Sequence, residues 1–246
     1  MVKQLDDLAG RTTSVRRPGW LVRPDGLVPY EAAYAAMHDL AERRAAGEIP
    51  DTLILLEHPP VYTAGRRWEA AHVRWSEAQI EAAGATLHHV DRGGSVTFHG
   101  PGQLVGYPIL DLGTRPDVIA HLRRIEETLI RAAADIGVEV HRDPDATGVW
   151  SGDGKVCAIG VKLTHARITL HGFALNCTTD LRWFGAIVPC GLPDRSVVSL
   201  TELAGREVTV QEMAPIVAAR FAEVFGVRLG PAPEPAAAGL LAFSPA

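Results

Sequence analysis

The chain has 246 residues, of which 47% are hydrophobic, and a formal net charge of -5 at pH 7. This composition allows one large core, and the charge gives no sign of the clustered positive surface that nucleic-acid binding needs. No apolar run approaches the roughly 20 residues of a membrane span, and the N-terminus lacks the apolar core of a signal peptide. We therefore expect one cytoplasmic domain over residues 19–230, with irregular tails at residues 1–18 and 231–246.

The N-terminal part of the domain predicts two helices and two short strands. Alanine and leucine recur at helical spacing in the first helix, while the second begins at Ser76 as N-cap and stops at Gly84. The first strand is a short apolar run that ends at two prolines, which lack the donors for a strand ladder. The expected elements are helices over residues 30–45 and 76–83 and strands over residues 52–56 and 86–90.

A glycine-rich run over residues 92–103 is the most informative segment, and it continues into an apolar strand over residues 104–112. Glycine loses more conformational freedom on folding than any other residue, so four glycines here indicate tight turns or a close approach of backbone to a ligand. Arg92 and His99 add polar chemistry beside this bare backbone. The run lacks the glycine-lysine-serine/threonine ending of a phosphate loop, and a substrate cradle is the interpretation we adopt.

The C-terminal half predicts a long amphipathic helix, two hairpins and a closing helix. The long helix covers residues 116–136. Its expected buried face consists of Ile119, Leu122, Ile125, Leu129 and Ala133. The remaining elements are strands over 138–141 and 148–150, a turn over 151–154, strands over 155–163 and 168–177, and a helix over 210–225. Hairpin-joined strands with separate helices favour the α+β class, a mixed β-sheet with helices packed on one side of it.

Cys190 is the cysteine whose surroundings suggest chemistry. The other cysteines are Cys157 and Cys177, and an odd number without CxxC spacing favours a reducing compartment without disulfides or a metal site. A proline before Cys190 and a glycine after it indicate a sharp, presented bend, where the N–H groups of Gly191 and Leu192 could stabilise an oxyanion. From this pattern alone, an inert structural role and a nucleophilic role both stay open for Cys190.

A nucleophilic thiol needs activation, because an ordinary cysteine pKa of about 8.5 leaves it mostly protonated at neutral pH. His99, His171 and Lys155 are the candidate partners. Lys155 opens an apolar strand, and it is either solvated at the strand end or directed into a dry pocket beside the thiol. Strand alternation places Cys157 on the face of Lys155, where it serves either as core packing or as a competing thiol.

Two neighbouring strands carry small and apolar residues side by side. They are Ala158, Ile159 and Gly160 on the first strand and Gly172, Phe173 and Ala174 on the second. Ordinary sheet packing would explain both groups. Beside a thiol, the same residues would line a narrow apolar slot that suits an acyl chain.

Five motifs occur in one order along the chain, at residues 56–63, 92–103, 155–160, 171–176 and 189–191. In sequence they are LEHPPVYT, RGGSVTFHGPGQ, KVCAIG, HGFALN and PCG. Together they resemble the lipoyl(octanoyl) transferase family over residues 28–203. The resemblance implies the fold of the biotin and lipoate protein ligase catalytic domain. It also implies transfer of an octanoyl group from octanoyl-acyl carrier protein, through an enzyme cysteine, to a lysine of a lipoyl domain, without a cofactor or metal.

By motif position, the resemblance implies that Cys190 is the acyl-thioester nucleophile and that Lys155 lowers its pKa. The implied substrate site combines the glycine-rich run with the two small-residue strands. Its members are Arg92, Gly93, Gly94, Ser95, Val96, Thr97, Phe98, His99, Ala158, Ile159, Gly160, His171, Gly172, Phe173 and Ala174. The implied acceptors are the lipoyl domains of 2-oxoacid dehydrogenase complexes and the glycine cleavage H protein.

Three other functions stay open: an ATP-dependent ligase of the same fold, a thioesterase, and a non-catalytic protein that binds lipoyl domains or carrier proteins. A presented Cys190 favours the transferase, because the ATP-dependent ligases activate a free acid as an adenylate and need no nucleophilic cysteine. Both expected protein partners are acidic, so charge complementarity predicts a basic patch at the mouth of the site. Its expected members are Arg66, Arg67, Lys162 and Arg195.

Overall fold

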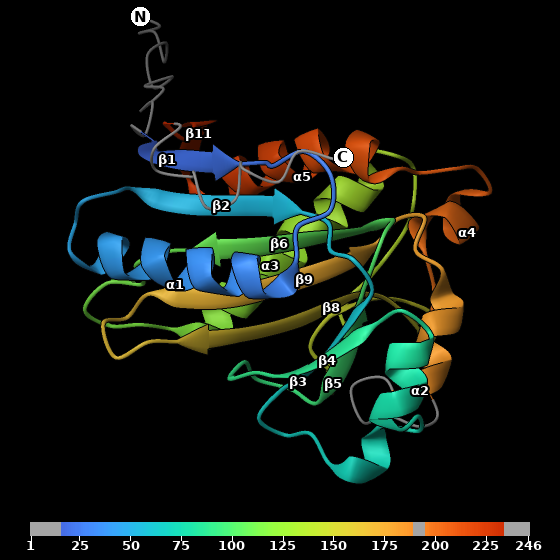
Figure 1. Cartoon of the computed structure of the whole chain (residues 1–246). Coiled ribbons are helices and arrows are strands. Elements are labelled where there is room, and N and C mark those ends of the chain that lie inside the picture. The colour runs from blue at the N-terminus through green and yellow to red at the C-terminus, as the bar shows by residue number, and fades with distance from the viewer. Residues whose placement is uncertain (1–15, 189–194, 234–246) are drawn as a thin grey trace, which may run out of the picture.

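The computed structural model describes residues 16–188 and 195–233. Two sheets organise this part of the chain, and the larger one runs across the middle of the molecule in Figure 1. Helix α1 lies on one face of the large sheet, and helices α3 and α5 lie on the other. The α+β class is therefore confirmed, but the helices cover both faces of the sheet instead of the one expected.

The large sheet is mixed, with strand order β10-β8-β9-β6-β2-β1-β11 and β7 paired to β8. Strand β1 pairs in parallel with β2 and β11, and β10 pairs in parallel with β8, while the other neighbours are antiparallel. The strands are β1 (Arg17–Val22), β2 (Asp51–Leu56), β6 (Gln103–Ile109), β7 (Val149–Ser151), β8 (Gly154–Leu163), β9 (Thr169–Asn176), β10 (Ser196–Val197) and β11 (Val227–Pro231). The pairing of β1 with β11 extends the sheet slightly beyond the expected limits at residues 19 and 230.

The small sheet has the order β4-β3-β5 and lies below the large one in Figure 1. Its strands are β3 (Val61–Ala64), β4 (Thr86–His89) and β5 (Val96–His99). Tyr62, Phe98 and Ile187 belong to a separate apolar cluster behind this sheet. Helix α2 (Glu77–Ala82) and the 3-10 helices η1 (Ala70–His72) and η2 (Leu181–Ala186) flank it.

The main helices form where sequence periodicity predicted them. Helices α1 (Tyr30–Ala45) and α5 (Val210–Phe225) match the expected ranges, α3 covers Val118–Ala134, and a short α4 covers Leu200–Ala204. Met37 of α1 packs on one side of the sheet, and Leu129 and Phe221 pack on the other. Full burial of each such side chain contributes about 1.5–3 kcal/mol, so the amphipathic faces hold the layers together. No helix in the described ranges is long and apolar enough to cross a membrane.

Two local predictions are wrong. Residues 138–141 do not form a strand, because only His141 bridges Trp150. The predicted face of α3 is also misplaced at its start, since Ile119 is 66% exposed. Ile119 precedes Ile125 by six residues, which is not a whole number of 3.6-residue turns, and it therefore points away from the buried stripe. His121 and Glu126 are buried on α3 instead.

Candidate active site

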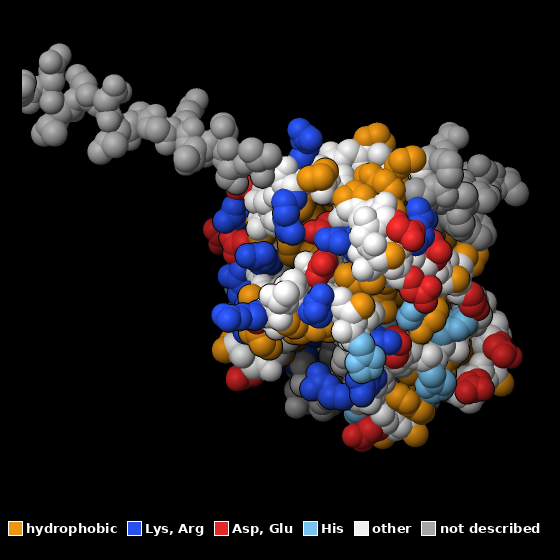
Figure 2. Space-filling view, turned by 90° about the vertical axis from the view of Figure 1, so that its left-hand side faces the viewer, with side chains coloured by type: hydrophobic (Ala, Val, Ile, Leu, Met, Phe, Trp, Pro, Cys, Tyr) orange, Lys and Arg blue, Asp and Glu red, His pale blue; other side chains and the backbone are white. Residues whose placement is uncertain are grey.

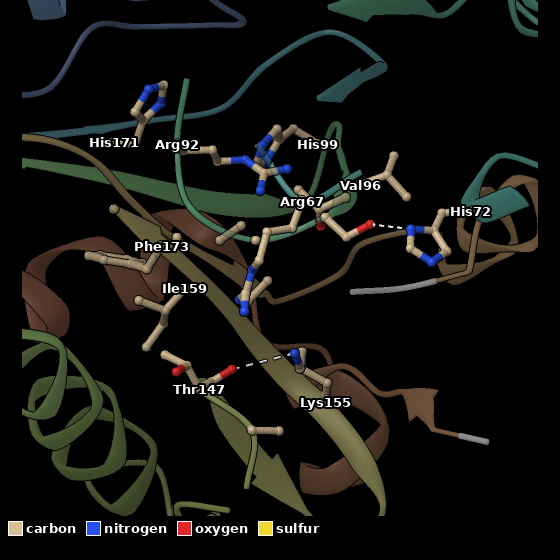
Figure 3. A pocket seen from close by; sticks show the side chains of 18 of the residues that line it. Arg67, His72, Arg92, Val96, His99, Thr147, Lys155, Ile159, His171 and Phe173 are labelled. Atoms are coloured by element: carbon tan, nitrogen blue, oxygen red, sulfur yellow. Dashed lines mark hydrogen bonds between the residues drawn. The ribbon is translucent and has the colours of Figure 1, made fainter. Parts of the chain in front are cut away.

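A pocket of about 560 Å³ lies between the small sheet and strands β8 and β9 of the large sheet. Every predicted substrate-site residue lines it except Gly93 and Phe98. The glycine-rich run supplies one wall and the small-residue strands supply the facing wall, as Figure 3 shows for the labelled side chains. Folding thus brings together three motifs that are far apart in the sequence.

The two exceptions support the pocket from behind. Thr97 and His99 face the pocket, and strand alternation turns Phe98 to the other side of β5. There Phe98 is fully buried, and its ring stacks on Trp183 with 5.3 Å between the centroids. The N–H of Gly93 donates to the carbonyl oxygen of Val161 on β8 at 3.0 Å, so Gly93 joins the two walls.

Glycines in or next to the neighbouring strands allow the backbone of the glycine-rich run to come close to them. A Cβ atom on Gly160 would lie 2.8 Å from the carbonyl oxygen of Gly93, and one on Gly65 would lie 2.6 Å from that of Gly94. Real Cβ atoms essentially never come so close. This close approach of backbone to backbone brings the loop against β8 and the end of β3, and the approach of backbone to a ligand stays a prediction.

Arg92 fixes this loop to β3. Its buried guanidinium donates to the carbonyl oxygen and the hydroxyl of Thr63, at 2.6 Å and 2.9 Å from Nη2, and to the carbonyl oxygen of Gly93 at 3.0 Å. Hydrogen bonds from a charged donor are roughly twice as strong as neutral ones. Arg92 therefore holds the shape of the pocket wall that it also lines.

His99 and Tyr107 form a polar end of the pocket, and His58, which does not line it, contacts Tyr107. His99 Nδ1 donates to Gln103 Oε1 at 2.9 Å. His58 Nδ1 donates to the carbonyl oxygen of Val28 at 2.7 Å, and its Nε2 accepts from the Tyr107 hydroxyl at 2.8 Å. Burial lowers the pKa of His58 to about 4 and that of His99 well below its ordinary value, so both are neutral at neutral pH. Sequence reasoning identified His99 but missed Tyr107.

His171 lies in the wall near this end, in a strained conformation. Its φ is +58°, a region that costs a non-glycine residue about 1–3 kcal/mol. Its Nε2 contacts Asp91 Oδ1 at 2.8 Å, and Asp91 also pairs with Lys162. The hydrogen bond from His171, supported by Lys162, holds the pKa of Asp91 well below its ordinary range. Asp91 was not predicted as a site residue, because its position directly before Arg92 was the only feature of the sequence that pointed to it.

Lys155 lies in the pocket away from His171 (Figure 3), and it is only 6% exposed. Its Nζ is 4.4 Å from the centroid of the Trp150 ring and 3.5 Å from the carbonyl oxygen of Thr147. The alternative of a solvated lysine at a strand end is therefore wrong. Sequence analysis named neither Thr147 nor Trp150 as a neighbour of Lys155, although the expected hairpin sets Trp150 opposite Lys155.

Cys190 lies outside the described residues. The chain on both sides of that gap is anchored to the site. The N–H of Val188 donates to the carbonyl oxygen of His72, which lines the pocket, at 2.8 Å. On the other side, Arg195 pairs with Asp143 at 2.8 Å and lies 5.0 Å from the centroid of the Trp150 ring.

The two described cysteines are structural. Cys157 and Cys177 are fully buried in the core between the large sheet and helices α3 and α5. Burial raises the pKa of the Cys157 thiol far above its ordinary value and that of Cys177 to about 12. Because the reactive species is the thiolate, both thiols are inert, and core packing is the role of Cys157.

The predicted basic patch is only partly free for a partner. Lys162 pairs with Asp91, and Arg195 pairs with Asp143 and Asp153. Arg66 and Arg67 are exposed, and Figure 3 shows the Arg67 side chain reaching into the pocket. In Figure 2, Lys and Arg side chains gather mainly on the left half of the face in view and Asp and Glu mainly on the right.

The described residues hold no cluster of three or more metal-ligating side chains.

Comparisons with known proteins place the chain among enzymes of lipoate attachment. Residues 29–222 match the family described as the lipoyl protein ligase A/B catalytic domain. The octanoyltransferase of Acidothermus cellulolyticus is 51% identical over 203 residues, which are 80% of this chain and 88% of that protein. That of Rubrobacter xylanophilus is 48% identical over 205 residues, 83% of this chain and 92% of that protein.

The fold extends to distant relatives. A bipartite lipoate protein ligase from Thermoplasma acidophilum superposes with a TM-score of 0.71 at 16% identity, covering 92% of this chain and 91% of that one. At this identity the likeness establishes the fold alone, which confirms the expected ligase-like architecture.

Proposed function

This chain belongs to the lipoyl protein ligase A/B catalytic-domain family, and we propose that it transfers an octanoyl group from the thioester of an acyl carrier protein, through Cys190, to a lysine of a lipoyl domain. Its sequence is 51% and 48% identical to those of two curated octanoyltransferases, and the chain is therefore an acyltransferase of protein lipoylation. The donor, the thioester intermediate and the acceptor are the parts that we propose.

The observation that carries the proposal is the placement of Lys155. A lysine held in a pocket wall supplies positive charge where an exposed lysine would be screened by water. A nearby cation favours the thiolate over the thiol. Before residues 189–194 the chain contacts the pocket residue His72 through Val188, and after them Arg195 lies over the same Trp150 ring as Lys155. These contacts support Cys190 as the thiol that Lys155 activates.

The reaction has two balanced steps. The Cys190 thiolate attacks the thioester carbonyl, a new carbon–sulfur bond forms, and the carrier's thiolate leaves and takes up a proton. The neutral ε-amine of the acceptor lysine then attacks the Cys190 thioester. An amide bond forms, the carbon–sulfur bond to Cys190 breaks, and the amine's proton returns to the cysteine. Because every acyl intermediate is a thioester, the sequence of steps consumes no ATP.

One set of assays separates this proposal from its alternatives. The transferase octanoylates a lipoyl domain from octanoyl-acyl carrier protein in the absence of nucleotide. A ligase instead requires free octanoate, ATP and magnesium, and it tolerates loss of Cys190. A thioesterase releases free octanoate without an acceptor, and a non-catalytic protein forms a complex with no transfer. Any of these three results contradicts the transferase.

Arg67 is expected to recognise the phosphate of the donor. Carrier proteins present the acyl group on a phosphopantetheine arm, and the Arg67 side chain reaches into the pocket where that arm would enter. A hydrogen bond to a charged partner contributes enough to change binding about tenfold or more. Arg67→Ala should therefore lower kcat/KM for octanoyl-4′-phosphopantetheine about tenfold, with little change for octanoyl-pantetheine, which lacks the phosphate.

The neighbouring arginine is the control for this prediction. Arg66 is also exposed, but it does not line the pocket. Arg66→Ala should leave both substrates unaffected. If Arg67→Ala slows the two substrates equally, the phosphate is recognised elsewhere.

A further inference from the structure

Trp150 is a fully buried residue of β7 with two cations against its ring. The Lys155 ammonium lies 4.4 Å from the ring centroid, and the Arg195 guanidinium lies 5.0 Å from it. Lys155 belongs to β8, whereas Arg195 is the first described residue after residues 189–194. A single indole therefore contacts both the pocket lysine and the chain that follows residues 189–194.

The indole is itself held in place. Its Nε1 donates to the carbonyl oxygen of Ala146 at 3.1 Å, and its backbone pairs with His141 through two hydrogen bonds. Asp143 accepts from two backbone N–H groups of the same loop and pairs with Arg195. The ring is thus held by its own hydrogen bonds, and it contacts the pocket residue Lys155 without lining the pocket itself.

Two of the carboxylates around this loop, Glu126 and Asp153, pair with arginines. Glu126 of α3 is fully buried, accepts from the N–H of Gly148 at 3.2 Å and pairs with Arg123 and Arg142. Asp153 pairs with Arg195. Asp145 also lines the pocket. Two contacts that help to place the ammonium are those with the Thr147 carbonyl oxygen and with the face of the indole.

We propose that Trp150 is a positioning residue, whose ring holds the Lys155 ammonium in the pocket wall and links it through Arg195 to the chain that follows residues 189–194. An aromatic face attracts a cation and has no such attraction for a neutral amine, and the attraction grows when water is excluded. The ring therefore favours Lys155 as a charged partner of a thiolate over Lys155 as a neutral base. This inference rests on the proposed function, in which Lys155 activates Cys190.

Two variants isolate the ring face. Trp150→Phe and Trp150→Leu both remove the hydrogen bond to Ala146, but only phenylalanine keeps an aromatic face. The readout is the rate of Cys190 alkylation by iodoacetamide against pH, measured on the peptide by mass spectrometry. Trp150→Leu should move the midpoint of the profile upward by about one pH unit, which corresponds to a tenfold change in the thiolate equilibrium. Trp150→Phe should stay close to the parent protein.

A fluorinated series covers the case in which Trp150→Leu fails to fold. Tryptophan analogues with one, two and three fluorine atoms at position 150 keep the shape of the ring while they weaken its attraction for a cation. The midpoint should rise stepwise with fluorine content, and a profile that is constant across the series overturns the inference. Lys155→Ala in the same assay tests the proposed function separately. If Lys155→Ala leaves the profile unchanged, it is the activation by Lys155 that fails.

Discussion

Replacing Lys155 by alanine should lower the rate of octanoyl transfer by about 100- to 10,000-fold, the range typical for loss of a positioned catalytic side chain. The side chain is almost completely buried in the pocket wall, so water cannot substitute for its charge. The measurement is single-turnover transfer from octanoyl-acyl carrier protein, which excludes effects of product release. Thermal unfolding of the variant checks that the fold is intact.

Lys155→Arg is the informative companion variant. Arginine retains a positive charge that can lie over the Trp150 ring, but its planar guanidinium is larger and differently shaped. Its rate should fall between those of the parent protein and Lys155→Ala. A loss of less than threefold in Lys155→Ala would remove Lys155 from the chemistry.

Gly172→Ala should destabilise the protein by about 3 kcal/mol or more, at the upper end of overpacking effects. A Cβ atom at this position would lie 2.1 Å from the carbonyl oxygen of Gly106 and 2.5 Å from Pro108 Cδ. Both obstacles belong to β6, the strand paired with β9 in the middle of the large sheet. A backbone oxygen cannot rotate away as a flexible side chain can, so the two strands must separate.

The free energy of unfolding by denaturant measures this effect. Gly185→Ala is the matched control, because a Cβ atom there meets no atom within 4 Å. It should change stability by less than about 0.5 kcal/mol. Equal stability of the two variants would contradict the close approach of β9 to β6.

Periodicity and capping predicted the elements that local sequence determines. The helices at Tyr30–Ala45 and Val210–Phe225 and the N-cap at Ser76 follow from spacing and from side-chain chemistry. The parallel pairing of β1 with β11 joins the two ends of the domain and leaves no local signal. The sequence also did not reveal that helices cover both faces of the large sheet. Both faces of a central strand are apolar, so its residue pattern does not show on which side a helix packs.

The site was predictable where a motif is contiguous. The glycine-rich run and the strand residues beside Lys155 follow from motifs, and the structure brings them to one pocket. Their supports come from elsewhere in the chain. Trp150 contacts Lys155 because the β7–β8 hairpin places them together, and Asp91, in the loop after β4, meets His171 of β9. No sequence spacing reveals the contact of Asp91 with His171, whereas the expected hairpin already sets Trp150 opposite Lys155.

The central claim is that the octanoyl group passes through Cys190, and intact mass spectrometry tests it most directly. The protein is incubated with octanoyl-acyl carrier protein in the absence of a lipoyl domain and of nucleotide. We expect one octanoyl group per chain, located on the Cys190 peptide and released when a lipoyl domain is added. The same adduct in Cys190→Ala, or octanoylation of the lipoyl domain by that variant at the parent rate, would contradict the account.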